Sequence, residues 1–155
     1  MGGNLLFVAL AIGAPALKDK SSPADGLVGE WVVESVIQYG REAGFPGEAR
    51  ITLTADGGCS FAVRGFEKPN KRPSRYAADP KSSPPTFDLI RTNLPPGWTG
   101  GNREWVGIYE LSGDKLTICY REWSDPRPTE FSSKKDSGQS LMVLRRAKPL
   151  PGSGR

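Results

Sequence analysis

The sequence predicts an all-β protein, an antiparallel up-and-down meander of about eight strands that closes into a barrel. Three observations lead to this prediction. Apolar and polar residues alternate with a period of two from Gly29 onward, and no segment has the 3.6-residue period of a helix. Two segments have the strand, tight turn, strand pattern of a β-hairpin. Glycine (19 residues) and proline (14 residues) are abundant, and both favour turns over helices.

The first predicted strand follows Gly29 and ends at Gly40. Strict alternation would place these side chains on one face: Trp31, Val33, Ser35, Ile37 and Tyr39. The next two strands, 50–54 and 59–63, flank Asp56-Gly57, a dipeptide that adopts the positive φ angles of a tight hairpin turn. Residues 76–79 and 86–90 are predicted as two further short strands.

A second hairpin consists of strands 104–111 and 116–120 around a Ser-Gly-Asp turn at 112–114. Gly107 lies within the first of these strands, where it permits a bend or a close approach of another backbone segment. A long polar connection, 124–138, leads to the last strand at 141–144. A barrel closed by these strands leaves no exposed edge.

The 155 residues fit one domain, predicted at 27–147 and followed by a polar tail at 148–155. Residues 5–14, LLFVALAIGA, form an uncharged apolar run that is shorter than the ~20 residues needed to cross a bilayer. Ala14-Pro15-Ala16 resembles a signal-peptidase site. We therefore expect a signal peptide at 1–16, a linker at 17–26, and export to the periplasm or the extracellular space without a membrane span. The alternative is that the run forms a first buried strand or helix.

The composition gives no support for an enzyme. The chain has no histidine, which removes the commonest general base and the commonest metal ligand. The spacing singles out no facing pair among these carboxylates: Glu104, Glu110, Glu122, Asp125 and Glu130. Gly-x-Ser-x-Gly and phosphate-binding loops are also missing from the sequence. We expect no catalytic residue, no metal site and no cofactor.

Cys59 and Cys119 are predicted to be free, partly buried thiols. Alternation places Cys59 on the apolar face with Phe61, and Cys119 on the face of Thr117, opposite Ile118. Side chains on opposite faces of one barrel wall cannot easily form a disulfide.

The net charge of +4 mildly favours anionic partners. Four cations gather in the loop at 65–75, namely Lys68, Lys71, Arg72 and Arg75. Nucleic-acid binding would favour interleaved aromatic residues, whereas Phe66 and Tyr76 only flank the loop. We therefore expect a solvated loop and no nucleic-acid partner.

One set of motifs carries a family resemblance. Residues 27–33, LVGEWVV, place Gly29-x-Trp31 at the start of the first strand, and 107–120, GIYELSGDKLTICY, is followed by 127–131, RPTEF. This order resembles the uncharacterised lipocalin-like domain found in many copies in planctomycete bacteria, over roughly Leu27 to Arg146. The resemblance implies a lipocalin-like barrel and frequent export, with no established activity. It also implies a structural pair at the barrel floor, Trp31 with Arg145, or with Arg146 as the alternative cation.

The RPTEF segment allows two interpretations. In the first, the segment contacts a ligand at the barrel mouth. In the second, it holds the long connection against the barrel. We favour the second interpretation because Pro128 is rigid and Phe131 is apolar.

Two hypotheses follow for the function. In the leading one, the barrel binds a small apolar or amphipathic molecule, and the protein partner is unknown. Its expected lining is Trp31, Val33, Leu53, Phe61, Phe87, Trp105, Tyr109, Leu116 and Ile118. In the alternative, these side chains fill the interior, and the protein acts through its surface as an interaction or cell-envelope module, with the loops at 68–75 and 92–102 as contact regions.

Overall fold

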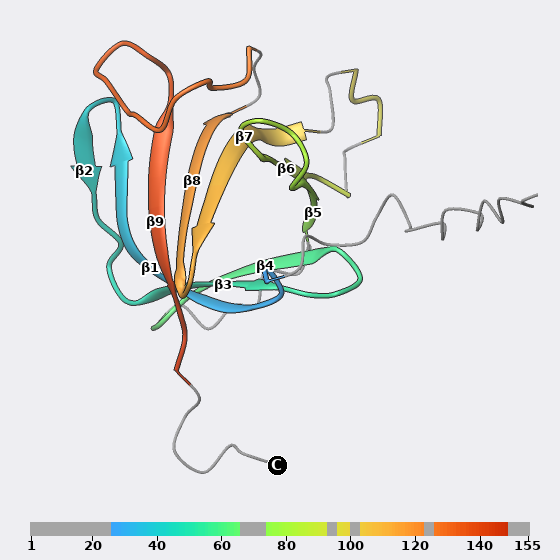
Figure 1. The fold of residues 1–155 in the computed structure, drawn as a ribbon, viewed down its shortest axis with the longest axis vertical. Helices are drawn as coiled ribbons and strands as arrows, with labels where there is room; N and C mark the ends of the chain where they lie inside the picture. Colours follow the sequence, from blue (N-terminus) through green and yellow to red (C-terminus); the bar gives the residue numbers. More distant parts are fainter. Residues whose placement is uncertain (1–25, 66–73, 93–95, 100–102, 123–125, 149–155) are drawn as a thin grey trace, which may run out of the picture.

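The computed structural model describes residues 26–65, 74–92, 96–99, 103–122 and 126–148 (Figure 1). The predicted signal peptide, the linker up to residue 25, the loop at 66–73 and most of the predicted tail lie outside these residues. The described residues contain no helix long and apolar enough to cross a membrane. They form nine strands: β1 (Gly29–Gln38), β2 (Arg41–Ala43), β3 (Ala49–Leu53), β4 (Gly58–Val63), β5 (Ser74–Asp79), β6 (Thr86–Ile90), β7 (Arg103–Ser112), β8 (Lys115–Glu122) and β9 (Ser140–Arg146).

The strands form a single antiparallel sheet that closes on itself. From β3 to β9 each strand pairs with the next one in the chain, and β1 pairs with both β3 and β9. This additional β1–β9 pairing closes the barrel, while the short strand β2 pairs only with the end of β1. In Figure 1, β8 and β9 stand side by side and β3 and β4 run across the lower part of the molecule. The predicted all-β meander and barrel closure are confirmed.

One end of the barrel is sealed by Trp31. Its side chain is fully buried, and its indole Nε1 donates a hydrogen bond to the carbonyl oxygen of Leu27 at 2.9 Å. The guanidinium carbon of Arg146 lies 4.3 Å from the centre of the indole ring. Arg146 also donates hydrogen bonds to the carbonyl oxygens of Gly26 (2.6 Å) and Val28 (3.2 Å). The segment that precedes β1 is thereby fixed across the barrel floor.

The prediction that Arg145 is the cation of the floor pair is wrong. Arg146 is the register partner of Trp31, so their side chains share one side of the sheet, whereas Arg145 faces the opposite side. Arg145 instead forms an ion pair with Glu34 at 3.2 Å. Gly29 fits the same arrangement, because its φ of 140° disfavours other residues and a Cβ there would lie 3.0 Å from the Arg146 guanidinium.

A β-bulge in β1 changes which side chains face inward. Val33 pairs with Leu144 and Ser35 pairs with Val143, so Glu34 is an extra residue without a partner in β9. Beyond the bulge, Val36 is buried in the core. The strict alternation predicted for the first strand therefore holds only up to the bulge.

The long connection between β8 and β9 packs on the outside of the barrel. Arg127 forms an ion pair with Asp88 of β6 and donates a hydrogen bond to the carbonyl oxygen of Gly107, at 2.6 Å. Val106 and Ile108, which alternate with the inward-facing residues of β7, are both buried. The Arg127 contacts agree with the structural interpretation of the RPTEF segment.

Candidate functional site

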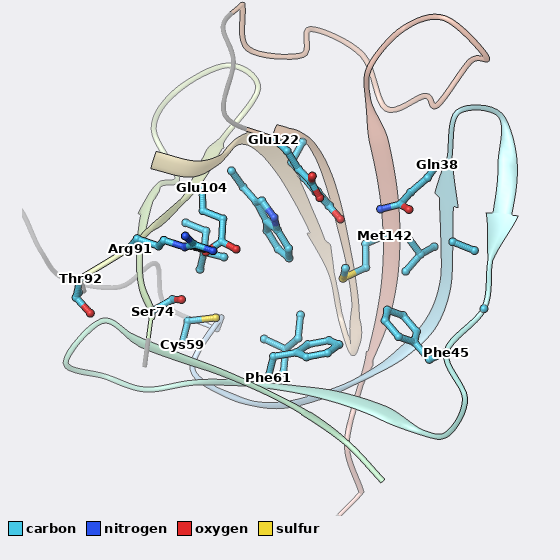
Figure 2. A pocket seen from close by; sticks show the side chains of 17 residues that line it. Gln38, Phe45, Cys59, Phe61, Ser74, Arg91, Thr92, Glu104, Glu122 and Met142 are labelled. Carbon is cyan, nitrogen blue, oxygen red and sulfur yellow. Dashed lines mark ion pairs between the residues drawn. The ribbon is translucent and has the colours of Figure 1, made fainter. Parts of the chain in front are cut away.

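The barrel holds a cavity of about 450 Å³ that opens to solvent beside exposed residues such as Phe45 and Glu122 (Figure 2). Its apolar lining comes from strands around the barrel and from the segment after β2: Val36, Ala43, Gly44, Phe45, Ile51, Cys59, Phe61, Leu89, Trp105 and Met142. The remaining lining residues carry polar groups: Gln38, Ser74, Arg91, Thr92, Glu104, Tyr120 and Glu122. Most of these lie at the strand ends farthest from the Trp31 floor.

Strand register explains why the apolar residues face the cavity. Directly opposed residues of antiparallel strands project to the same side of a sheet. Leu89 of β6 is the partner of Trp105 of β7, and Val36 of β1 is the partner of Met142 of β9. Each cross-strand pair therefore contributes two neighbouring side chains to the cavity wall.

A second β-bulge brings an acidic residue into this wall. Leu89 pairs with Trp105 and Ile90 pairs with Arg103, so Glu104 is the extra residue in β7. Alternation alone would direct Glu104 and Trp105 to opposite faces, but a bulge can turn two successive side chains to the same face. Both residues line the cavity. The Glu104 carboxylate lies 3.6 Å from Nε of Arg91, and Figure 2 shows the two side chains next to each other.

Aromatic rings form one side of the cavity. Trp105 and Tyr120 are stacked with ring centroids 4.0 Å apart and an interplanar angle of 18°. Burial, followed by the nearby charge of Glu122, raises the pKa of Tyr120 to about 12, although hydrogen bonds with Ser140 and Gln38 act in the opposite direction. The Tyr120 phenol therefore stays neutral at physiological pH and serves as a polar point on an apolar wall.

A second aromatic pair lies near the point along β1 where its neighbouring strand changes from β3 to β2. β1 pairs with β3 only from Gly29 to Val32, after which β2 takes the place of β3 along β1. Phe45 and Phe61 meet near this point, with ring centroids 5.6 Å apart and an interplanar angle of 52°. Phe45 is 39% exposed, so it is a lining residue that also contacts solvent.

The predicted lining residues separate into two groups. All nine belong to the interior core cluster or pack against it. Phe61 and Trp105 line the cavity, whereas the others do not. Those others include Phe87, whose ring lies 6.5 Å from Tyr109 in an edge-to-face arrangement. The half of the barrel nearest the floor is thus filled by large side chains, and the cavity occupies the other half.

Several lining residues were not predicted. Ile51, Leu89 and Tyr120 each belong to a strand whose alternation the sequence shows, so pattern reasoning could have included them, whereas Met142 lies in the unbroken apolar run 141–144. Glu104 carries no such signal, because its inward orientation depends on a bulge.

The two thiols are free and buried on opposite sides of the barrel wall, as predicted. Cys59 lines the cavity, and burial together with the nearby charge of Glu104 raises its pKa to about 12. Cys119 faces the long connection, where its Sγ lies 3.4 Å from the carbonyl oxygen of Ser132. Among the described residues, no group of three or more Cys, Asp or Glu side chains is arranged to hold a metal ion.

The two loops considered as contact surfaces are described only in part. Lys68, Lys71 and Arg72 lie outside the described residues, while Arg75 donates a hydrogen bond to the carbonyl oxygen of Asp56. In the loop at 92–102, Trp98 is 46% exposed.

Comparisons with protein-family models, with curated proteins and with solved structures give no match to this chain.

Proposed function

We propose that the barrel binds one small apolar or amphipathic molecule in the cavity between Val36, Phe61, Trp105 and Met142. The observation that carries this proposal is the cavity itself, a volume of about 450 Å³ above a packed floor. Ligand sites in proteins typically occupy about 300–1,000 Å³ and combine apolar walls with a few polar groups. An apolar ligand would displace water from such walls, which is favourable by about 25 cal/mol for each Å² of apolar surface buried.

The distribution of polar groups favours an amphipathic ligand. The apolar part would contact the aromatic and aliphatic wall, and the head group would lie among Arg91, Glu104 and Glu122. Kinship with the planctomycete lipocalin-like domain and export of the chain are part of the same proposal. They rest on the sequence motifs and on the apolar run at 5–14.

A fluorescence titration with the neutral apolar probe N-phenyl-1-naphthylamine tests the binding proposal. We expect saturable probe enhancement with the wild-type chain. The substitution Val36→Phe places a larger side chain in the cavity and should weaken probe binding about tenfold or more, a change of about 1.4 kcal/mol. Val143→Phe is the matched control, since Val143 follows Met142 in β9 and projects to the outer face.

The tryptophans identify where the probe lies. Trp105 lines the cavity, so Trp105→Phe should remove most of the tryptophan quenching that accompanies probe binding, while Trp98→Phe should not. Absence of probe binding by the folded wild-type chain would contradict the proposal and favour the surface-mediated alternative. Equal binding by Val36→Phe and wild type would also contradict it.

A further inference from the structure

We propose that the preferred ligand is an amphiphile whose head group carries a positive charge, such as a protonated amine on an apolar tail. This inference rests on the proposed function and specifies its ligand class. The structural basis is the juxtaposition, among the described lining residues, of two carboxylates, Glu104 and Glu122, with one cation, Arg91, at the mouth of the cavity.

Both carboxylates face the cavity for reasons of strand geometry. Glu122 is the register partner of Trp105, so it shares the inner side of the wall with that ring. Glu104 is turned inward by the β7 bulge. Figure 2 shows Glu104 beside Arg91 at the left of the cavity and Glu122 at its top, with Phe61 below them.

Arg91, the one cation among the described lining residues, is already engaged in an ion pair. The Nε atom of Arg91 lies 3.6 Å from Glu104 Oε2, and among the described residues no ion pair involves Glu122. The described charged residues that line the cavity therefore sum to −1, although the whole chain carries +4. A carboxylate head group would have to displace Glu104 from Arg91 and would approach Glu122, whereas an ammonium group would pair with Glu122 directly.

Glu104 is partly buried, whereas Glu122 at the end of β8 is exposed, so solvent screens Glu122 more strongly. Charges a few ångströms apart interact about four times more strongly at the effective dielectric constant of a protein surface region than in bulk water. After burial, which is the larger cause, the charge of Glu104 raises the pKa of Cys59 and the charge of Glu122 raises that of Tyr120, as expected where carboxylates disfavour a further negative charge.

Competition among three probes with the same ten-carbon tail tests the inference. Decylamine, decanol and decanoate are each titrated at pH 7 against bound N-phenyl-1-naphthylamine, below their aggregation concentrations. We expect decylamine to bind about tenfold more tightly than decanoate, with decanol between them. Glu122→Gln should bring decylamine close to decanol. Glu104→Gln removes one of the two carboxylates and should narrow the difference between decylamine and decanoate.

Glu110→Gln is the matched control, because it removes the same charge from an exposed position on β7 that does not line the cavity. It should leave the order of the three probes unchanged. Decanoate binding equal to or tighter than decylamine would overturn the inference while leaving the binding proposal intact. An equal loss of preference in Glu110→Gln and Glu122→Gln would also overturn it, since the effect would then come from overall charge. Failure of the wild-type chain to bind the neutral probe at all would instead contradict the proposed function.

Discussion

Arg146 combines several contacts at the barrel floor. Its guanidinium covers the Trp31 ring, donates to two backbone carbonyls before β1, and lies 3.3 Å from the Asp114 carboxylate in the β7–β8 turn. Arginine suits this position because its planar group stacks on an aromatic face while its N–H groups remain available to carbonyl oxygens. The side chain therefore ties the segment before β1, the β7–β8 turn and the end of β9 to one buried ring.

Loss of these contacts should destabilise the fold. Arg146→Ala removes the cation–π contact and leaves the Gly26 and Val28 carbonyls without their partner, and we expect the free energy of unfolding to fall by about 2 kcal/mol. Urea denaturation monitored by circular dichroism measures this change. Arg145→Ala is the control, because its ion pair with Glu34 is exposed and should contribute less than about 1 kcal/mol. Equal effects of the two substitutions would contradict the assigned role of Arg146.

Two buried groups, the Cys59 thiol and the Tyr120 phenol, should make the free energy of unfolding decrease at alkaline pH. Burial is the main cause that raises the pKa of the Cys59 thiol from 9.0 to about 12, and of the Tyr120 phenol from 10.0 to about 12. The unfolded chain releases these protons first, so it binds fewer protons than the folded chain between about pH 9 and 12. The stabilising effect of the two neutral groups is complete below pH 9 and decreases as the pH rises.

Each such group should lower the free energy of unfolding by at most about 1.4 kcal/mol per pH unit in that window. Urea unfolding at pH 8, 9.5 and 10.5 measures the decrease, and Cys59→Ala should reduce its slope. An identical slope in wild type and Cys59→Ala would show that the thiol is not a buried neutral group in the folded state.

Gly107 lies at a point where the backbones of the neighbouring strands β6 and β8 approach β7 closely. A Cβ at this position would lie 2.7 Å from the carbonyl oxygen of Cys119 and 3.0 Å from that of Phe87, on the two neighbouring strands. The same residue accepts a hydrogen bond from Arg127, which holds the long connection in place. Strands β6, β7 and β8 can therefore keep this spacing only around a glycine.

We expect Gly107→Ala to lower the free energy of unfolding by about 2–3 kcal/mol, because both obstructing atoms belong to the backbone. Thermal and urea denaturation measure the effect. Gly44→Ala is the control, since nothing lies within 4 Å of a Cβ built there, and it should change stability by less than about 0.5 kcal/mol. A neutral Gly107→Ala would refute the close approach.

The elements could be predicted from the sequence wherever alternation was regular. The two hairpins follow from turn residues and apolar periodicity, and so does the placement of Cys59 and Cys119 on opposite faces. The last strand follows instead from its unbroken apolar run at 141–144. The bulges at Glu34 and Glu104 could not be predicted, because a bulge depends on the register of a partner strand that lies far away in the chain.

The candidate site was predictable to the same limited extent. Apolar periodicity identified the inward face, so Phe61 and Trp105 were correctly expected at the cavity. Periodicity does not show how far along a barrel the side chains fill the interior. That distribution depends on the sizes of residues brought together by closure, such as Trp31, Phe87 and Tyr109 near the floor. The Glu104–Arg91 ion pair at the mouth follows from the bulge and was missed for that reason.

At the scale of the whole molecule, the barrel combines a packed half with a hollow half. The floor supplies the buried apolar contacts that stabilise a closed sheet, and the β1–β9 pairing leaves the wall continuous there. The other half leaves Met142, Phe61 and Trp105 beside unfilled volume. A ligand that binds the folded chain and not the unfolded chain stabilises the folded state, so binding should also raise the melting temperature.

The most direct test of this account uses Met142 as a reporter. The chain has two methionines, Met1 and Met142, and Met142 lines the cavity. In a chain labelled with ¹³C at the methionine methyl groups, Met142→Leu assigns the resonance. We predict a large, saturable shift of the Met142 methyl signal on titration with N-phenyl-1-naphthylamine, and its loss in Val36→Phe. A Met142 resonance that stays unchanged up to the solubility limit of the probe would contradict the account.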